Sequence, residues 1–152
     1  MKHNFDNLLS DLGAEIGIPE LCADEANVCN LLFDEVAVSL ELSEDGEALY
    51  ISSLVGQVRQ DGGAAQLAAL LDANFLFSGT GGATFGVDKA SGSIVLARSE
   101  RLSGLGKPLF LSVLEEFVDL AEAWQKRLAQ PFEMDEGQAE APEAPQDYGA
   151  RV

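Results

Sequence analysis

Four glycines in one short stretch could form a loop that binds phosphate. They stand at positions 79, 81, 82 and 86, and Gly81 and Gly86 have the spacing with which a phosphate-binding loop begins. Val87 and Asp88 follow Gly86, so the lysine that would meet the phosphates is missing and an acid stands close by. The stretch also leads into a strand-like run, whereas an anion-binding loop opens a helix. The sequence therefore favours a structural connection, in which the glycines supply positive φ angles.

Other residue types that could perform catalysis or bind metal are few. His3 is the only histidine and stands near the first residue, without the neighbours that would hold a general base or a metal ligand. Cys22 and Cys29 are the only cysteines, no histidine pairs with them, and we expect two reduced thiols. The acidic turn at 44–47 is too short for a calcium loop. We expect no catalytic residue, no metal and no cofactor.

Composition and charge narrow the class of partner. The chain has 152 residues, of which 47% are apolar, and is large enough for one domain with its own core. Its 26 acidic and nine basic residues give a net charge of -17, which argues against binding to nucleic acid or to anionic membrane surfaces. No apolar run approaches the roughly 20 residues that span a bilayer, and residues 1–6 do not resemble a secretion signal. We expect a cytoplasmic protein whose partners are polypeptides.

Hydrophobic periodicity predicts the elements that position these residues. Helical spacing of apolar residues predicts helices over 4–17 and from Lys107 to just before Pro131, and Asp61 is a candidate cap for a helix that ends near Asn74. Short apolar or alternating runs predict strands over five ranges: 28–33, 36–42, 48–55, 84–87 and 93–97. The last two flank a turn that ends in Gly92 and form a hairpin.

The order of these elements is α-β-β-β-α-β-β-α. This order predicts an α+β domain over residues 1–130, with one antiparallel sheet packed by helices. Residues 131–152 are rich in Pro, Glu, Gln, Ala and Asp, and their composition predicts an acidic disordered tail.

The helix expected after Asp61 has an unusual surface. Residues 64–74 contain no basic residue and almost no charged face. A helix that is apolar nearly all round must be buried on two sides, so we expect the sheet on one side and a second copy of the chain on the other. The expected homodimer interface consists of Leu67, Leu70, Leu71, Ile94 and Leu96.

Several short sequence segments, in their order along the chain, resemble those of one known family. They are Leu70–Asn74, Gly79–Asp88, Ser91–Leu96, Leu114–Phe117 and Ala123–Trp124. Together with the element order and the acidity they resemble the class I type III secretion chaperones, the Tir chaperone family, over about residues 5–129. The acidic tail lies outside the family pattern. The resemblance implies a bacterial cytoplasmic homodimer that is not an enzyme. It would bind the N-terminal region of a secreted effector and keep it soluble and competent for export, without ATP.

An extended segment gains affinity by placing apolar side chains in pockets and by adding a strand to a free sheet edge. Exposed apolar patches on such proteins commonly mark interaction sites. We expect effector binding at Leu8, Leu12, Phe33, Val38, Leu40 and Tyr50, with the last helix as a further patch. The alternative is an acidic interaction or inhibitor protein that acts on a basic partner through charge. Its complex would weaken steeply with salt, whereas a complex formed in apolar grooves would not.

Overall fold

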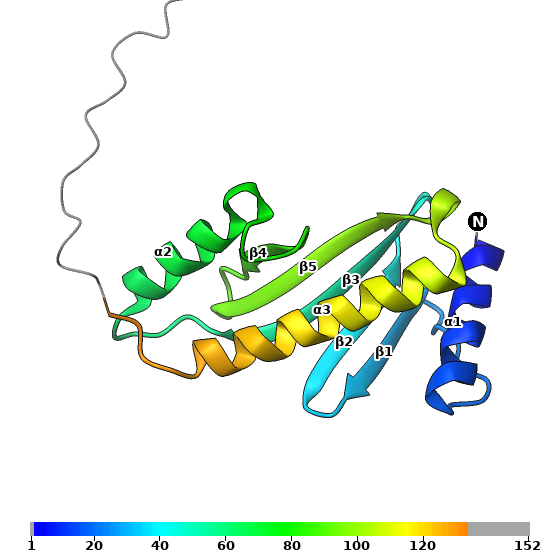
Figure 1. Ribbon diagram of the computed structural model, residues 1–152, viewed down its shortest axis with the longest axis horizontal. Helices are drawn as coiled ribbons and strands as arrows, with labels where there is room; N and C mark the ends of the chain where they lie inside the picture. Colours follow the sequence, from blue (N-terminus) through cyan, green and yellow to red (C-terminus); the bar gives the residue numbers. More distant parts are fainter. Residues whose placement is uncertain (1, 134–152) are drawn as a thin grey trace, which may run out of the picture.

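Residues 2–133, which a computed structural model describes, form three α-helices and one five-stranded antiparallel sheet (Figure 1). The elements are α1 (Lys2–Ile16), β1 (Val28–Phe33), β2 (Val36–Leu42), β3 (Ala48–Gln57), α2 (Gly63–Asn74), β4 (Thr84–Val87), β5 (Ser93–Arg101) and α3 (Lys107–Leu128). Short 3-10 turns follow α2 (η1, Phe75–Phe77) and β5 (η2, Leu102–Gly104). The predicted α+β order with a single antiparallel sheet is confirmed.

The strand order in the sheet is β1-β2-β3-β5-β4. β1, β2 and β3 form a meander, and the β4–β5 hairpin adds to it through β5, which pairs antiparallel with β3. The register shifts between Leu54 and Gly56, which marks a bulge in β3. Gly56 is packed closely there, since a Cβ atom at this position would lie 3.1 Å from the Leu128 Cδ1 atom of α3.

One face of the sheet is covered by α3 and forms the core. Strands place alternate side chains on opposite faces, and the buried apolar residues of β2 and β3 lie on the face that α3 covers. On β2 the buried residues are Val36, Val38, Leu40 and Leu42. Phe110 and Phe117 of α3 are fully buried against this face. Burial of each such side chain stabilises the fold by roughly 1.5–3 kcal/mol. α1 lies at one end of α3, and α2 lies beside β4 at the other end of the molecule (Figure 1).

The start of α2 differs from the prediction. The N-cap residue is Gly62, with φ of 75°, and no side chain caps the helix. The prediction of Asp61 as the cap is therefore wrong, because the chain turns one residue later through the glycine. The buried Gln66 side chain ties this helix to β3: its Oε1 atom accepts from Arg59 N, and its Nε2 atom donates to Gln57 O.

Packing continues a little beyond α3. The Phe132 ring is buried, and the Arg127 guanidinium carbon lies 4.2 Å from its centre, a cation–π arrangement. The acidic tail expected at 131–152 lies outside the described residues from 134 onward. Its expected disorder therefore stays a prediction.

Candidate functional site

An apolar groove lies between α1, α3 and the end of β1. Its volume is about 350 Å³, and it is lined by Leu12, Glu15, Ile16, Phe33, Leu111, Leu114, Glu115, Val118 and Asp119. We call it the α1/α3 groove. The lining is apolar at the base and acidic at the border.

Helical spacing brings the apolar lining together. Leu111, Leu114 and Val118 lie three and four residues apart on α3, so they share one face. Leu12 and Ile16 lie four residues apart on α1 and meet this face from the side. Phe33, the last residue of β1, is half-buried and completes the groove. The lining thus comes from two helices and the end of one strand.

A second apolar surface lies at the end of α2. Leu71, Phe75, Leu76 and Phe77 are 69%, 67%, 80% and 54% exposed, and we call them the α2 patch. Leu76 and Phe77 also have positive φ angles, of 51° and 57°. This conformation is uncommon for bulky side chains and costs of order 1–3 kcal/mol per residue. Exposed apolar patches on soluble proteins commonly mark interaction surfaces.

The residues expected to bind an effector do not form one surface. Leu8, Val38 and Leu40 are buried in the core of this chain, because they belong to the faces of α1 and β2 that pack against α3 and the sheet. They cannot contact a partner unless the core opens. Leu12 is buried but lines the α1/α3 groove together with Phe33.

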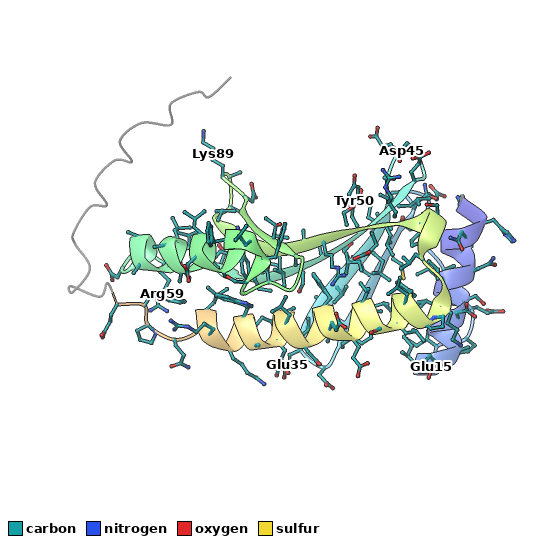
Figure 2. The ribbon with its side chains drawn as sticks, turned by 45° about the horizontal axis from the view of Figure 1, so that its top comes forward. Glu15, Glu35, Asp45, Tyr50, Arg59 and Lys89 are labelled. Carbon is teal, nitrogen blue, oxygen red and sulfur yellow. The ribbon has the colours of Figure 1, made fainter. Side chains whose placement is uncertain are left out.

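Tyr50 is 45% exposed but does not line the α1/α3 groove. It lies on β3 and points away from α3, on the opposite side of the molecule from Glu15 and Glu35 (Figure 2). Only Phe33 and Tyr50 of the expected set therefore combine an apolar ring with some exposure, and they lie on different sides of the sheet.

The residues expected to form a dimer interface are also divided. Leu70, Ile94 and Leu96 are buried in the core, so their side chains face the interior of this chain. Leu67 is partly buried against the same core, and Leu71 is exposed in the α2 patch. The exposed surface of α2 thus extends to η1 and includes Phe75, Leu76 and Phe77, which the expected interface omitted.

Two sets of surface residues were missed by sequence reasoning. Ile16, Leu111 and Val118 continue the helical stripes, so spacing alone places them in the core. Phe75, Leu76 and Phe77 could have been found from the sequence. They are three consecutive large apolar residues that directly follow an apolar helix, and the next strand begins only at residue 84.

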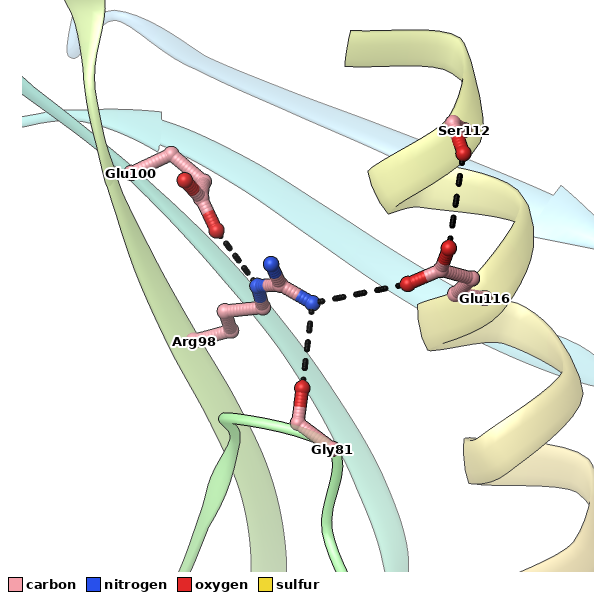
Figure 3. A network of polar contacts seen from close by, with 5 residues as sticks. All are labelled: Gly81, Arg98, Glu100, Ser112 and Glu116. Carbon is pink, nitrogen blue, oxygen red and sulfur yellow. Dashed lines mark hydrogen bonds and ion pairs between the residues drawn. The ribbon is translucent and has the colours of Figure 1, made fainter. Parts of the chain in front are cut away.

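The main polar network surrounds Arg98 on β5 (Figure 3). The Arg98 Nε atom donates to Glu100 Oε1 at 2.5 Å, and its Nη1 atom donates to Gly81 O at 3.3 Å. Glu116 of α3 lies 4.0 Å from the same Nη1 atom. Because the guanidinium is engaged by carboxylates and a backbone oxygen, the network holds the 78–83 connection against β5 and α3.

Trp124 of α3 supports the same connection. Its Nε1 atom donates to Gly79 O at 3.1 Å, and its ring packs edge-on against Phe85, with centroids 4.7 Å apart. Gly81 and Gly82 have φ angles of 54° and 95°, so the expected role of the glycines as a turn with positive φ holds at these two positions. The stretch is a clamped connection into β4.

The shifted pKa values belong to structural groups. Burial is the main cause that raises the pKa of the Cys29 thiol, with a smaller contribution from the charges of Cys22 and Asp24. The described residues contain no group of three or more His, Cys, Asp and Glu side chains arranged to hold a metal. The described helices are too short or too polar to cross a bilayer.

The fold and the two apolar surfaces define a small α+β binding protein that presents a groove at one end and a patch at the other. The model of the Tir chaperone protein (CesT) family matches residues 7–125, and the chain belongs to this family. The transcriptional anti-antiactivator ExsC of Pseudomonas aeruginosa is 32% identical over 131 residues, which cover 84% of this chain and 88% of ExsC.

Solved structures agree with this assignment. The chain matches one from the ExsC–ExsE complex with a TM-score of 0.68 and 31% identity, over 81% of this chain and 92% of that one. It matches one from the HopA1–SchA chaperone–effector complex with a TM-score of 0.66 and 21% identity, over 83% of this chain and 98% of that one. The second likeness concerns the fold alone.

Proposed function

We propose that this chain is a type III secretion chaperone that acts by binding, without catalysis. It binds the N-terminal region of a secreted effector, the client, and keeps it soluble and competent for export. The observation that carries this proposal is membership of the Tir chaperone family over residues 7–125, a range that includes every residue of the two apolar surfaces. Binding before export places the chain in the bacterial cytoplasm.

The apolar surfaces supply a physical basis for this function. An unfolded client segment exposes apolar side chains that would otherwise aggregate. The α1/α3 groove and the exposed Tyr50 ring offer places where such side chains can leave water. The strongly acidic surface keeps a protein with exposed apolar patches from associating with itself indiscriminately.

The active form that we propose is a homodimer. The α2 patch supports this, because four large apolar side chains remain exposed there: Leu71 on α2, a helix that carries almost no charge, and three more in η1, which follows it directly. The strained backbone at Leu76 and Phe77 is stable only if its surroundings fix it, and a second copy would do so. A dimer also presents two grooves to one client, which raises the effective concentration for the second contact.

The experiment that tests the function removes the gene in its native host. We expect the export of one or a few type III clients to fall and the clients to become insoluble or degraded, as measured by quantitative mass spectrometry of supernatant, soluble and insoluble fractions. A client without its N-terminal region serves as the control and should no longer co-purify with the chain. Unchanged export and solubility of every type III client in the deletion strain would overturn the proposal.

A second function is favoured by one specific relative. ExsC carries the name of a transcriptional anti-antiactivator, and it is 32% identical to this chain. The second candidate is therefore a regulator that controls transcription by binding a negative regulator. A transcriptional reporter in the deletion strain separates the two functions: the chaperone alone changes client export, whereas the regulator lowers the reporter signal as well.

A further inference from the structure

The border of the α1/α3 groove is acidic on both sides. Glu15 of α1, and Glu115 and Asp119 of α3, are exposed and belong to its lining. Asp34 and Glu35 follow Phe33 directly in the β1–β2 turn, and Figure 2 shows Glu15 and Glu35 along the same border of the molecule, next to α3. Five carboxylates thus stand in or next to the lining of one apolar groove.

Few cations within the described residues balance these carboxylates. Lys107 Nζ lies 3.7 Å from Glu15 Oε2, in a pair exposed to solvent. Glu115 and Asp119 stand four residues apart on α3, and no ion pair joins either of them to a cation of residues 2–133. Like charges at this spacing destabilise a helix. A cation bound between them would relieve this repulsion.

We propose that the α1/α3 groove takes a client segment in which a large apolar side chain is flanked by lysine or arginine. This inference rests on the proposed function and specifies the chemistry of the client. The apolar base removes the central side chain from water, and the acidic border attracts the basic neighbours. A groove of about 350 Å³ is at the lower end of the range for ligand pockets, so it suits one or two side chains of a segment.

The charge pattern disfavours the other possible occupants. A second copy of this chain carries the same net charge of -17 and would bring further acids to an acidic border. An acidic peptide meets the same repulsion. A segment with basic residues only would gain charge attraction but leave the apolar base exposed to water.

The test uses three short fluorescent peptides and the full-length chain. Each peptide has leucines at its centre, and the flanking residues are lysine, glutamine or glutamate. Fluorescence anisotropy at low salt should give affinities in the order Lys, Gln, Glu, with about a tenfold difference between the Lys and Gln peptides, equal to about 1.4 kcal/mol. The difference should shrink at high salt, because salt screens exposed charges. A Lys peptide with serines in place of the leucines should bind much more weakly.

Two double variants locate the site with equal changes in net charge. E115Q/D119N removes two carboxylates from the border of the groove, whereas E25Q/E122Q removes two exposed carboxylates that do not line it. We expect the first variant to lose most of the preference for the Lys peptide and the second to keep it. Equal losses in the two variants would mean that net charge, not the groove, selects the peptide, and would overturn the proposal.

The remaining outcomes separate this inference from the function on which it rests. If the native client is captured but binds E115Q/D119N and L111S as tightly as the unchanged chain, the inference fails and the proposed function stands. If no client depends on the chain for export, the proposed function fails. If L111S lowers the molar mass of the free chain in solution, the groove is an interface between copies and the inference fails.

Discussion

At the residue scale, two aspartates each stabilise a turn by accepting hydrogen bonds within it. Asp45 Oδ1 accepts from Ser43 Oγ at 2.6 Å and from Glu47 N at 3.0 Å, in the β2–β3 turn. Asp88 accepts from Ser91 Oγ at 2.6 Å and from Ala90 N at 3.0 Å, in the β4–β5 turn. The serine hydrogen bond is the largest cause that lowers the pKa of each carboxyl, followed by the backbone N–H. Each bond favours the charged form.

This arrangement predicts how stability depends on pH. The native pKa of Asp88 lies below its unfolded value of about 3.9, so its contribution is complete above that pH and is lost as pH falls through the native pKa. D88N should therefore be less stable than the unchanged chain at neutral pH, and the gap should close in acid. Urea unfolding at a series of pH values measures this. D61N is the control, because Asp61 is also exposed and lies just before α2. If the difference in unfolding free energy between D88N and the unchanged chain stays constant down to low pH, the prediction is contradicted.

At the element scale, the junction between α2 and the connection into β4 depends on close packing. A Cβ atom at Gly79 would lie 2.8 Å from the Ala73 Cβ atom and 3.0 Å from the Ala73 Cα atom. The end of α2 is also fixed by Asn74, whose side chain accepts from Phe85 N and donates to Phe85 O. Gly79 therefore allows α2, β4 and Trp124 to meet.

We predict that G79A lowers the free energy of unfolding by about 1–3 kcal/mol, the usual effect of adding volume to a packed site. G86A is the matched control, because nothing lies within 4 Å of a Cβ atom at Gly86 in β4. It should change stability by less than about 0.5 kcal/mol. Urea denaturation of the two variants measures the difference. Equal unfolding midpoints for G79A and G86A would contradict the prediction and would show that Ala73 can move aside.

Short strands with a clear pattern and clear ends were predictable from the sequence. β1, β2 and β4 have the predicted bounds, because β2 alternates between apolar and polar residues, and β1 and β4 are short apolar runs that end at turn residues. β5 extends four residues past the predicted end at Ala97, through Arg98, Ser99, Glu100 and Arg101. A polar run of this kind does not indicate a strand by itself, and its pairing with Ala48–Ile51 of β3 determines its conformation.

The surfaces were less predictable, for a related reason. The sequence pattern reveals which side chains are apolar but not which of them a helix will cover. Val38 and Leu40 were expected at a partner surface and lie under α3, since that helix packs across β2 and β3. α2 is apolar on all sides, so periodicity could not separate Leu70, which is buried, from Leu71, which is exposed.

At the scale of the whole molecule, the two apolar surfaces lie on elements at opposite ends. α1 lies at one end, with the groove beside it, and α2 lies at the other (Figure 1). Contact through the α2 patch would therefore leave the α1/α3 grooves of both copies open to a client. The proposed assembly and the proposed client site do not compete for the same residues.

We predict that L71E/L76N converts the proposed dimer to a monomer at micromolar concentration, as measured by light scattering. Glutamate places a charge in the apolar patch, and asparagine tolerates the positive φ at position 76 better than leucine, so the fold should be kept. L32N is the control, because Leu32 is 71% exposed on β1, outside the patch. A dimeric mass for the double variant, or a monomeric mass for the unchanged chain, would contradict the α2 interface.

The strand order also determines when each strand can find its neighbours during synthesis. β3 pairs with β2, which precedes it, and with β5, which begins only at Ser93 after α2 and β4. Ribosomes add roughly 5–20 residues per second, so several seconds of synthesis separate the completion of β3 from the arrival of its second neighbour. During that interval the nascent β1–β3 meander has an open edge, and α3 has not yet been made to cover Leu49 and Ile51. A protein proposed to keep the apolar side chains of a client out of water therefore exposes its own apolar side chains while it is being synthesised.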